Sequence, residues 1–528
     1  MARSLICLCL TGQTLEEDLD IANEYRAYID IVELRADFLT EDERLRIREF
    51  PEMVKMPCIL TIRRICDGGR YSDGEGARTA LFARALAFAQ QDSRKNFAYV
   101  DFEEDFQVPS LEDAAMAFGT KIIRSFHDME NPVDNVAEKI RALRLTGYEI
   151  SKVAFMPHGL SDVTSLFQEA SQFRGTEQIV CAMGEFGLPS RILAAKFNSY
   201  LTYTSPAELL ENLSVIGHCD PKTLEQSYRF RSISARTRVF GITGYPLKVT
   251  ASPKIHNEKQ RQLLLDSVYI PFRSETAQEA FDFADALGML GYSVTIPHKE
   301  SIIEYLDWTD EKVKKIGACN TVIKSGKEWR GYNTDCTGFS RSLVEFVEKA
   351  TGKIGIDGMK VSVIGAGGAS RAIVYALKEL GANVCVFNRT SMKARKLAEQ
   401  FGFAWAGLGA DSISKISEYS DIIVQTTSKG MGITEDSDES NDPLWFYEFT
   451  GKELVYDVIY EPEQTPILKR ASLCGCKTCN GYTMFIYQAI LQIELFMQSY
   501  TEATAPRDRA SIKRMINVLL NSMGLEKI

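Results

Sequence analysis

The sequence lacks a long hydrophobic run. None of the apolar stretches in its 528 residues approaches the roughly 18 residues that a membrane-spanning helix requires. The start, MARSLICLCL, has one arginine and a short apolar segment without a small-residue cleavage site, so it does not resemble a secretory signal peptide. We therefore expect a cytoplasmic protein that has no membrane partner.

An excess of positive charge is also missing. The chain has 61 lysines and arginines against 71 aspartates and glutamates, which gives a formal net charge of −10. Proteins that follow a nucleic-acid backbone usually carry a basic surface that neutralises the phosphates. The balance here argues against a nucleic-acid partner, although local lysines and arginines can still bind a small anionic substrate.

Histidine is absent around the densest cysteine cluster. Residues 474–479 read CGCKTC, with no histidine nearby and no second CxxC pair to complete a ligand set. A structural zinc site needs four cysteine or histidine ligands, so we expect no metal. In a chain without a signal peptide, the twelve cysteines are expected to be reduced thiols.

A glycine-rich stretch at residues 361–390 organises the second half of the chain. Its sequence, VSVIGAGGASRAIVYALKELGANVCVFNRT, predicts a strand, a glycine turn, a helix and a second strand. Glycines at such a turn let the backbone approach a pyrophosphate, and the helix N-terminus presents free N–H groups to it. The alternative is a strand–helix–strand unit that binds no ligand.

The end of the second strand in this stretch bears on the choice of cofactor. It reads Asn388-Arg389-Thr390, without the acidic residue that accepts hydrogen bonds from the ribose 2′-hydroxyl of NAD. An arginine at this place suits a 2′-phosphate, so the sequence favours NADP over NAD.

The first 205 residues contain eight apolar, strand-like runs, with helical patterns between most of them. The runs cover residues 4–10, 31–37, 58–63, 98–103, 121–128, 150–157, 179–184 and 199–205. Eight strand–helix units in about 200 residues fit a short (β/α)8 barrel. A doubly wound sheet is the alternative architecture.

A barrel of this kind carries its chemistry at the C-terminal ends of its strands. Charged and polar residues gather late in the predicted strands or just after them, namely Glu33, Arg35, Arg63, Asp101, Glu103, His127, Lys152 and Arg191. A lysine inside a closed barrel would lose hydration, which favours the neutral amine that can attack a ketone. Lys152 could instead lie at a solvated strand start, and His127 could be an ordinary core histidine.

The motifs VELRAD, TIRR, SFHD, SKVAFMP and CAMGEFGLPSR resemble type I 3-dehydroquinate dehydratase over nearly all of residues 1–215. The resemblance implies that Lys152 forms an imine with the substrate ketone and that His127 moves protons. It gives carboxylate and hydroxyl binding to Glu33, Arg35, Arg63 and Arg191. Two further positions predicted to bind the substrate depart from the family pattern, with Asp67 in place of a glutamate and Glu208 in place of a neutral amide.

A polar segment at residues 220–238 separates this half from a new strand pattern that starts at Val239. Thr250 and Ser252 lie at a predicted helix start, where their hydroxyls could bind a carboxylate or act as plain N-caps. Polar residues then follow successive strands, namely Thr295, Lys299, Asn320 and Asp335, and we expect them to face one cleft beside the dinucleotide domain.

The segments GYPLKVTASPKIHN, SVTIPHK, GACNT, GYNTDCTG, GAGGASRA, NRT, DVIYEPEQTPIL and NGYTMFIYQA resemble shikimate dehydrogenase from about residue 239 to the end. The resemblance implies NADPH-dependent reduction of 3-dehydroshikimate to shikimate, with Lys299 and Asp335 as the catalytic pair. It assigns substrate contacts to Thr250, Ser252, Thr295, Asn320, Tyr460 and Gln488. It assigns NADP binding to Gly365, Ala366, Gly367, Gly368, Ala369, Asn388, Arg389 and Thr390.

Together the two resemblances imply a fused enzyme that catalyses consecutive steps on small molecules of the shikimate pathway. The predicted domains are a barrel (1–219), a linker (220–238), an α/β substrate domain (239–345), a Rossmann NADP domain (346–478) and C-terminal helices that return to the substrate domain (479–528). A dehydrogenase half that prefers quinate and NAD is one alternative. A non-catalytic protein that senses the metabolites is another.

Overall fold

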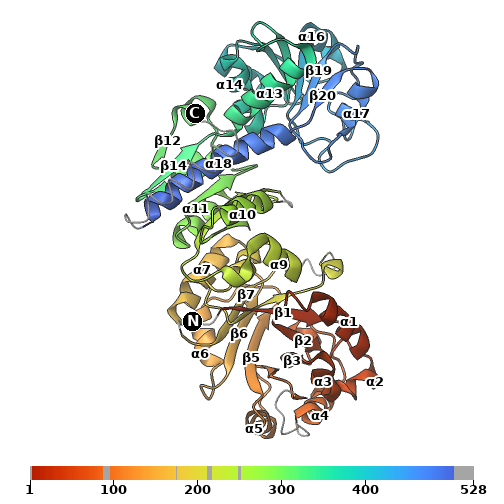
Figure 1. Ribbon diagram of the computed structural model, residues 1–528, viewed down its shortest axis with the longest axis vertical. Coiled ribbons are helices and arrows are strands. Elements are labelled where there is room, and N and C mark those ends of the chain that lie inside the picture. Colours follow the sequence, from red (N-terminus) through yellow and green to blue (C-terminus); the bar gives the residue numbers. More distant parts are fainter. Residues whose placement is uncertain (1–2, 87–94, 174, 211–216, 248–250, 505–528) are drawn as a thin grey trace. The chain divides into compact units, whose positions relative to one another are not determined.

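The computed structural model describes residues 3–86, 95–173, 175–210, 217–247 and 251–504 (Figure 1). The chain divides into two compact units, Met1–Met289 and Leu290–Ile528.

The first unit begins with eight parallel strands that form a barrel. The strands are β1 (Leu5–Leu10), β2 (Ile31–Arg35), β3 (Cys58–Thr61), β4 (Tyr99–Glu103), β5 (Lys121–Asp128), β6 (Ile150–Phe155), β7 (Gln178–Ala182) and β8 (Leu201–Thr204). Neighbours follow the order of the sequence from β1 to β7, and β8 pairs with β1. The amide of Tyr200 donates a hydrogen bond of 2.6 Å to the carbonyl of Gln178, which links the last two strands. The barrel prediction is confirmed, and the doubly wound alternative is excluded.

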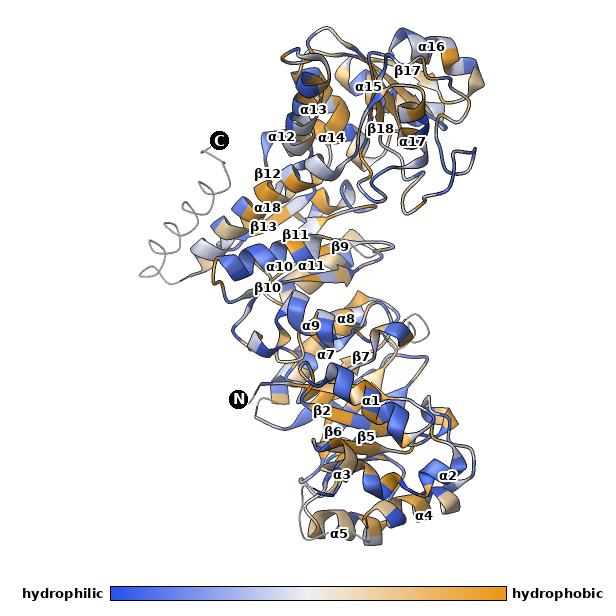
Figure 2. Cartoon of the chain, turned by 45° about the vertical axis from the view of Figure 1, so that its right-hand side comes forward, coloured by the Kyte–Doolittle hydropathy of each residue, from blue (hydrophilic) through white to orange (hydrophobic). Residues whose placement is uncertain are grey.

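Helices connect most of these strands. They are α1 (Leu15–Tyr25), α2 (Glu41–Arg44), α3 (Phe50–Val54), α4 (Glu75–Leu86), α5 (Pro109–Ala117), α6 (Val136–Ala142), α7 (Leu160–Ala170) and α8 (Leu188–Ile192). Side-chain caps start two of them, because Thr14 accepts from the amide of Glu17 and Asn135 accepts from the amide of Glu138. In Figure 2 the strands β5 and β6 are coloured largely as hydrophobic.

The barrel interior is built in layers, because side chains on a strand alternate between its two faces. One apolar layer receives a residue from every strand, namely Cys7, Ile31, Ile59, Tyr99, Ile123, Ile150, Ile179 and Leu201. Two residues further along the strands, the inward positions hold polar groups, including Glu33, Thr61, Asp101, Ser125 and Lys152. The apolar layer closes one end of the barrel, so the polar layer faces the C-terminal ends of the strands.

The segment predicted as a linker contains a helix. Asp220 caps α9 (Pro221–Tyr228) by accepting a hydrogen bond from the amide of Thr223, and Leu224 and Tyr228 are buried. Then follow the parallel strands β9 (Arg238–Gly244) and β10 (Ser267–Arg273), with helices α10 (Ser252–Gln262) and α11 (Ala277–Ala286). The domain boundaries of the sequence analysis stay a prediction.

The second unit starts with a mixed sheet. Strands β11 (Gly291–Val294), β13 (Thr321–Ser325) and β14 (Glu328–Tyr332) pair antiparallel, and the short β12 (Trp308–Thr309) runs parallel to β14. Two helices belong to this part, α12 (Glu311–Ile316) and α13 (Asp335–Thr351).

A six-stranded parallel sheet follows in the same unit. Its strands are β15 (Lys360–Ile364), β16 (Asn383–Asn388), β17 (Ala404–Gly407), β18 (Ile422–Gln425), β19 (Leu454–Asp457) and β20 (Lys477–Cys479). They lie in the order β17-β16-β15-β18-β19-β20, which is the order of dinucleotide-binding folds. The predicted Rossmann domain is confirmed, and the strand order reverses beside β15, where such folds bind their ligand.

Helices α14 (Gly368–Glu379), α15 (Ser391–Phe401), α16 (Ile413–Glu418) and α17 (Pro466–Leu473) accompany this sheet. The long α18 (Tyr482–Ala503) packs against α13, and Gly338 makes the close approach possible. A Cβ on Gly338 would lie 2.9 Å from the amide nitrogen of Gln488. A larger residue there would push the two helices apart.

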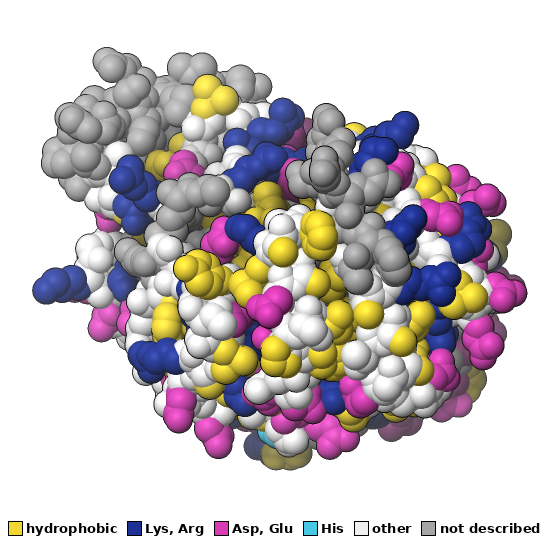
Figure 3. All heavy atoms as spheres, turned by 90° about the horizontal axis from the view of Figure 1, so that it is seen from below, with side chains coloured by type: hydrophobic (Ala, Val, Ile, Leu, Met, Phe, Trp, Pro, Cys, Tyr) yellow, Lys and Arg dark blue, Asp and Glu magenta, His cyan; other side chains and the backbone are white. Residues whose placement is uncertain are grey.

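Surface and composition add three observations. On the face that Figure 3 shows, acidic and basic side chains are interspersed with apolar ones. No helix within the described ranges is long and apolar enough to span a membrane. The twelve cysteines all lie in the described part of the chain and none forms a disulfide.

Candidate active sites

Lys152 lies in the polar layer of the barrel, inside β6. Lys152 is 5% exposed. Its Nζ lies 2.9 Å from Oδ2 of Asp101 and 3.9 Å from Oε1 of Glu33, and it stands 4.3 Å from the ring centre of Tyr203. The two carboxylates and the aromatic face offset the loss of hydration that burial imposes on an ammonium group.

The ion pair of Lys152 is part of a longer series of buried charges. Arg63 binds Asp101 and Glu103, both at 2.9 Å, and Glu103 also binds Arg78 at 2.7 Å. Positive and negative groups therefore alternate along Arg78, Glu103, Arg63, Asp101, Lys152 and Glu33, which have side-chain exposures of at most 6%. Arg63 and Lys152 hold the pKa of Asp101 well below its usual range against the opposing effect of burial.

His127 lies near the end of β5 and faces the same interior. Burial, together with the charges of Arg63 and Lys152, holds its pKa well below the usual value of a histidine. Its Nδ1 atom is buried and has no hydrogen-bond partner among the described residues. A neutral imidazole with an uncommitted nitrogen can exchange a proton with a ligand.

One cavity, of about 70 Å³, connects these groups. It brings together seven of the residues predicted for the first site, namely Glu33, Arg35, Arg63, Asp67, His127, Lys152 and Arg191. Asp67 follows β3 in a short turn, and its carboxylate lies 2.6 Å from Nε of Arg64. Glu208 is not among the lining residues and is exposed in a turn after β8.

Three residues of this cavity region had no role predicted from the sequence. Asp101 lies at the end of a strand where polar residues were noted, but its pairing with Lys152 requires the barrel geometry. Tyr203 and His218 line the cavity from β8 and from the segment after it. The phenol oxygen of Tyr203 is buried without a hydrogen-bond partner in the described part of the chain.

In the second unit, Lys299 and Asp335 form a close pair. Nζ of Lys299 lies 2.6 Å from Oδ2 of Asp335, and the side chains are 13% and 9% exposed. Lys299 follows β11 in a turn, and Asp335 is the first residue of α13. Asn320 donates from Nδ2 to Oδ1 of Asp335 at 2.8 Å, which fixes the carboxylate from its other side.

Gln492 on α18 hydrogen-bonds to Asn320, the residue that holds Asp335. No role was predicted for it from the sequence. It is 3% exposed. Its Nε2 donates to the carbonyl of Asn320 at 3.3 Å and to Oγ1 of Thr321 at 3.0 Å, and its Oε1 accepts from Ser293 at 2.9 Å. The only signal in the sequence is a second glutamine one helical turn after Gln488.

The other residues predicted for the substrate are placed as follows. Thr295 is half-buried after β11, and its carbonyl accepts from the amide of His298. Tyr460 stacks on Phe485 with 4.5 Å between ring centres, and the half-buried Gln488 donates to the carbonyl of Phe485. Ser252 is the first residue of α10 in the first unit and is 6% exposed, while Thr250 lies outside the described residues.

The turn between β15 and α14 fits a dinucleotide pyrophosphate. Gly365 has φ +118°, and a Cβ there would lie 2.5 Å from Oγ1 of Thr426. A Cβ on Gly367 would meet nothing within 4 Å, so open space lies above this residue at the N-terminus of α14. Gly368, Ala366 and Ala369 are partly exposed beside it.

The glycine turn also lies next to the Lys299–Asp335 pair. A Cβ on Gly368 would be 3.6 Å from Cδ of Lys299, so the catalytic candidate and the candidate cofactor loop are in contact. At the end of β16, Asn388 donates to the carbonyl of Thr390, and Arg389 and Thr390 are exposed. An exposed guanidinium there suits the 2′-phosphate of NADP.

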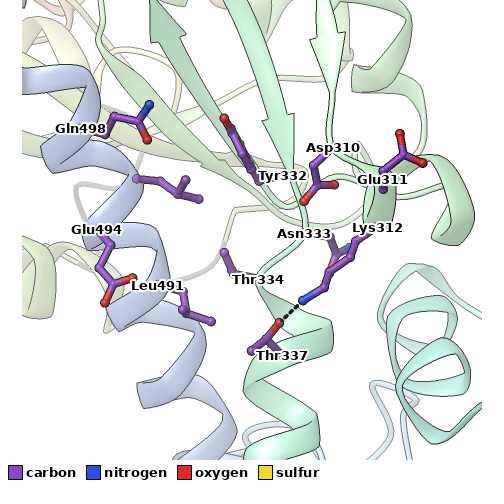
Figure 4. Close-up of a pocket in the computed structure, with 11 residues that line it drawn as sticks. Asp310, Glu311, Lys312, Tyr332, Asn333, Thr334, Thr337, Leu491, Glu494 and Gln498 are labelled. Carbon is purple, nitrogen blue, oxygen red and sulfur yellow. Dashed lines mark hydrogen bonds between the residues drawn. The ribbon is translucent and has the colours of Figure 1, made fainter. Parts of the chain in front are cut away.

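A larger cavity of about 510 Å³ lies elsewhere in the second unit (Figure 4). Its lining comes from α12, β14, the start of α13 and α18, and Lys312 donates to Thr337 at 2.7 Å within it. Asp310, Glu311 and Glu494 outnumber its one lysine, which is unfavourable for a carboxylate substrate. Neither Lys299 nor Asp335 belongs to its described lining.

Comparison with known proteins matches both halves. The model of type I 3-dehydroquinase matches residues 6–235, the shikimate dehydrogenase substrate binding domain matches residues 242–322, and shikimate/quinate 5-dehydrogenase matches residues 346–441. Shikimate dehydrogenase (NADP(+)) of Caldanaerobacter subterraneus subsp. tengcongensis is 39% identical over 49% of this chain and 90% of its own length. A crystal structure of shikimate dehydrogenase from Aquifex aeolicus, 33% identical, covers 54% of this chain and 99% of its own with a TM-score of 0.44.

One relative spans both halves. It is the chloroplastic bifunctional 3-dehydroquinate dehydratase/shikimate dehydrogenase of Arabidopsis thaliana, 31% identical over 96% of this chain and 83% of its own length. The match therefore includes both the barrel with Lys152 and the Rossmann unit with the Lys299–Asp335 pair of this chain. The chain belongs to the family of bifunctional 3-dehydroquinate dehydratase/shikimate dehydrogenases.

Proposed function

We propose that Lys152 is the nucleophile of the dehydratase reaction, which converts 3-dehydroquinate to 3-dehydroshikimate. Lys152 first gives the proton of its ammonium group to the neutral imidazole of His127, and the free amine attacks the ketone carbon of the substrate. The imidazolium returns this proton to the carbinolamine hydroxyl, which leaves as water and gives the protonated imine. The protonated imine withdraws electrons, so the neighbouring C–H becomes acidic and the β-hydroxyl group leaves as water. Hydrolysis of the imine then releases the product and restores Lys152.

His127 moves the protons in this scheme. Its neutral imidazole accepts the proton from the acidified carbon and returns a proton to the departing hydroxyl group. Glu33, Arg35, Arg63, Asp67 and Arg191 orient the carboxylate and the hydroxyl groups of the substrate around the same cavity. The observation that carries this half of the proposal is the 2.9 Å pairing of Lys152 with Asp101 beside a neutral His127 in one cavity.

In the dehydrogenase half, Lys299 delivers the proton to the carbonyl oxygen of 3-dehydroshikimate as it becomes the hydroxyl of shikimate. Asp335, at 2.6 Å, keeps the ammonium group in place, and Asn320 keeps Asp335 in place. NADPH, when bound, supplies the hydride. Ser252, Thr250, Thr295, Tyr460 and Gln488 complete the substrate contacts in this proposal.

The cofactor residues are those of the turn after β15 and of the end of β16. Gly365, Ala366, Gly367, Gly368 and Ala369 bind the pyrophosphate through backbone N–H groups at the start of α14. Asn388, Arg389 and Thr390 contact the adenosine end. Replacement of Arg389 by alanine tests the assignment against the quinate/NAD alternative: the preference for NADPH over NADH should fall by about tenfold. A preference for NADH and quinate in the unaltered enzyme would favour that alternative.

Two single substitutions test whether the two reactions depend on separate lysines. Lys152→Ala should abolish dehydration of 3-dehydroquinate and leave NADPH-dependent reduction unchanged. Lys299→Ala should do the opposite. Loss of both activities in either folded variant would contradict the two-site model, and inactivity of the unaltered protein in both assays would favour a metabolite sensor.

The imine can be trapped directly. Borohydride added with 3-dehydroquinate should attach ligand mass to Lys152, as read by peptide mass spectrometry. An unmodified Lys152 in an enzyme that still turns over would reject the imine.

The proposal includes partners and location. The substrates are small carboxylates, and a net charge of −10 with interspersed surface charges fits a protein without a nucleic-acid partner. The cytoplasmic location stays part of the proposal, and fluorescence imaging of the tagged full chain in its native cell is its test.

A further inference from the structure

The segment after β8 contains His218, which the proposed chemistry does not use. Glu208, the residue predicted to contact the substrate, is exposed, and its charge acts on Tyr25 and Lys222 instead. The neighbouring amide of Ala207 donates to the hydroxyl of Tyr25 at 3.0 Å, which holds this turn against α1. Ten residues further on, His218 lines the cavity of Lys152.

His218 is held in place by the end of the barrel. Cys219 pairs with Thr204 of β8 in an isolated parallel bridge, and the amide of Ser205 donates to the carbonyl of Cys219 at 3.4 Å. The hydroxyl of Ser205, a residue that is 1% exposed, lies 2.6 Å from Nδ1 of His218. These contacts fix the imidazole at the C-terminal end of a strand, where barrel enzymes carry their chemistry.

Burial and nearby positive charges favour the neutral ring of His218. Burial and the nearby positive charges of Arg191, Arg35 and Lys152 lower its pKa well below the usual value. Because Nδ1 is engaged by Ser205, Nε2 is the ring atom that can hydrogen-bond to a ligand. Arg191, Arg35 and Lys152 belong to the same cavity lining, so a ligand that they bind lies beside His218.

We propose that His218 is a substrate-contacting residue of the dehydratase site and that its Nε2 hydrogen-bonds to a hydroxyl group of the carboxylated, polyhydroxylated substrate ring. A hydroxyl is the suitable partner because it both donates and accepts, so it matches Nε2 in either tautomer of the imidazole. The three cations serve the carboxylate and the lysine chemistry, whereas His218 recognises a neutral group. This inference rests on the proposed dehydratase function.

Three variants test it in the full chain. His218→Ala removes the hydrogen bond, His218→Gln keeps a side-chain amide that can reach a hydroxyl, and Lys222→Ala is the control on the outer surface, where Lys222 pairs with Glu24. For His218→Ala, KM for 3-dehydroquinate should rise by about tenfold, the factor expected for one lost hydrogen bond. His218→Gln should stay within about threefold of the unaltered enzyme, and Lys222→Ala should not differ from it.

A second readout separates binding from chemistry. Borohydride trapping of 3-dehydroshikimate on Lys152 should need about tenfold more ligand for half-maximal labelling in His218→Ala. NADPH-dependent reduction should be unchanged in every variant, and a thermal unfolding curve like that of the unaltered enzyme shows that the barrel is folded. Unaltered KM and trapping in His218→Ala, or an equal defect in His218→Gln, would overturn the role of His218. Failure of the unaltered enzyme to dehydrate 3-dehydroquinate or to be trapped would instead overturn the proposed function.

Discussion

At the scale of single residues, the buried charges of the barrel explain how a lysine can be kept inside an apolar fold. A buried ammonium group alone would be strongly disfavoured, but Lys152 has Asp101 at 2.9 Å and Glu33 at 3.9 Å. Removing one partner of such a pair leaves an uncompensated charge, which costs about 3–5 kcal/mol. Each member of the alternating series therefore depends on its neighbours.

Asp101→Asn should lower the free energy of unfolding by about 3 kcal/mol, because both Lys152 and Arg63 lose a carboxylate. The same change should lower kcat of dehydration by about tenfold or more, since Lys152 loses the group that positions it. Denaturant titration and steady-state assays measure the two effects. Asp105→Asn is the matched control, because Asp105 binds Arg64 with 60% of its side chain exposed and should contribute about 1 kcal/mol or less.

The lowered pKa of His127 predicts how the rate of dehydration depends on pH. Its pKa is lowered by burial and by Arg63 and Lys152, so the neutral form persists as the pH falls through the ordinary histidine range near 6.5. If the neutral imidazole is the base, kcat/KM for dehydration should stay nearly constant between pH 8 and pH 6 and fall only at lower pH. Half-loss of kcat/KM near pH 6.5, absent in the dehydrogenase reaction of the same chain, would contradict this role.

At the scale of elements, the turn from β15 to α14 separates two requirements for glycine. Gly365 needs a positive φ and has no room for a side chain, whereas Gly367 has room but lies where a pyrophosphate would approach. The first requirement concerns the fold, and the second concerns the ligand.

Gly365→Ala should therefore lower the free energy of unfolding by about 2 kcal/mol or more, through the strained φ and the clash with Thr426. Gly367→Ala should leave the unfolding free energy nearly unchanged and raise KM for NADPH by about tenfold. Thermal or denaturant unfolding and NADPH titrations distinguish the two. Equal effects of both substitutions on stability would contradict the separation.

The elements themselves were largely predictable from the sequence. All eight barrel strands overlap the apolar runs, because buried parallel strands consist of nearly continuous apolar residues. The Rossmann unit was predictable because glycines at 365, 367 and 368 stand between a strand and a helix pattern. Helix α9 was not predictable in the linker segment, because its buried apolar residues, Leu224 and Tyr228, are few among polar ones.

Contacts between distant residues were the part that the sequence could not provide. Asp101 is 51 positions from Lys152, and Gln492 is 172 positions from Asn320. No periodicity within one element connects such pairs, because only the closed barrel and the return of α18 bring them together. The same holds for His218, since its position beside the cavity depends on the Thr204–Cys219 bridge.

At the scale of the whole molecule, the charged groups that we propose for each reaction lie within one unit. The Lys152 series belongs to Met1–Met289, and the Lys299 pair with the glycine turn belongs to Leu290–Ile528. The product of the first reaction is the substrate of the second. The two proposed centres share no charged residue, so we expect each to be inactivated independently of the other.

Mixing the variants Lys152→Ala and Lys299→Ala should restore the conversion of 3-dehydroquinate to shikimate. Each protein supplies the step that the other lacks, with the intermediate passing through solution. Product analysis by mass spectrometry measures the conversion, and each variant alone with 3-dehydroquinate and NADPH is the control. If the mixture makes 3-dehydroshikimate but no shikimate, while Lys152→Ala alone reduces added 3-dehydroshikimate, the intermediate must be retained by the chain that made it.

The alternating charges inside the barrel also constrain how this enzyme can evolve. Three cations and three anions balance one another there, from Arg78 to Glu33. Any single neutralisation leaves an unpaired buried charge, so accepted changes must arrive in compensating pairs. We therefore expect relatives of this enzyme to show correlated substitutions at positions 78 and 103, or at positions 63 and 101. A change at only one of these positions should be selected against.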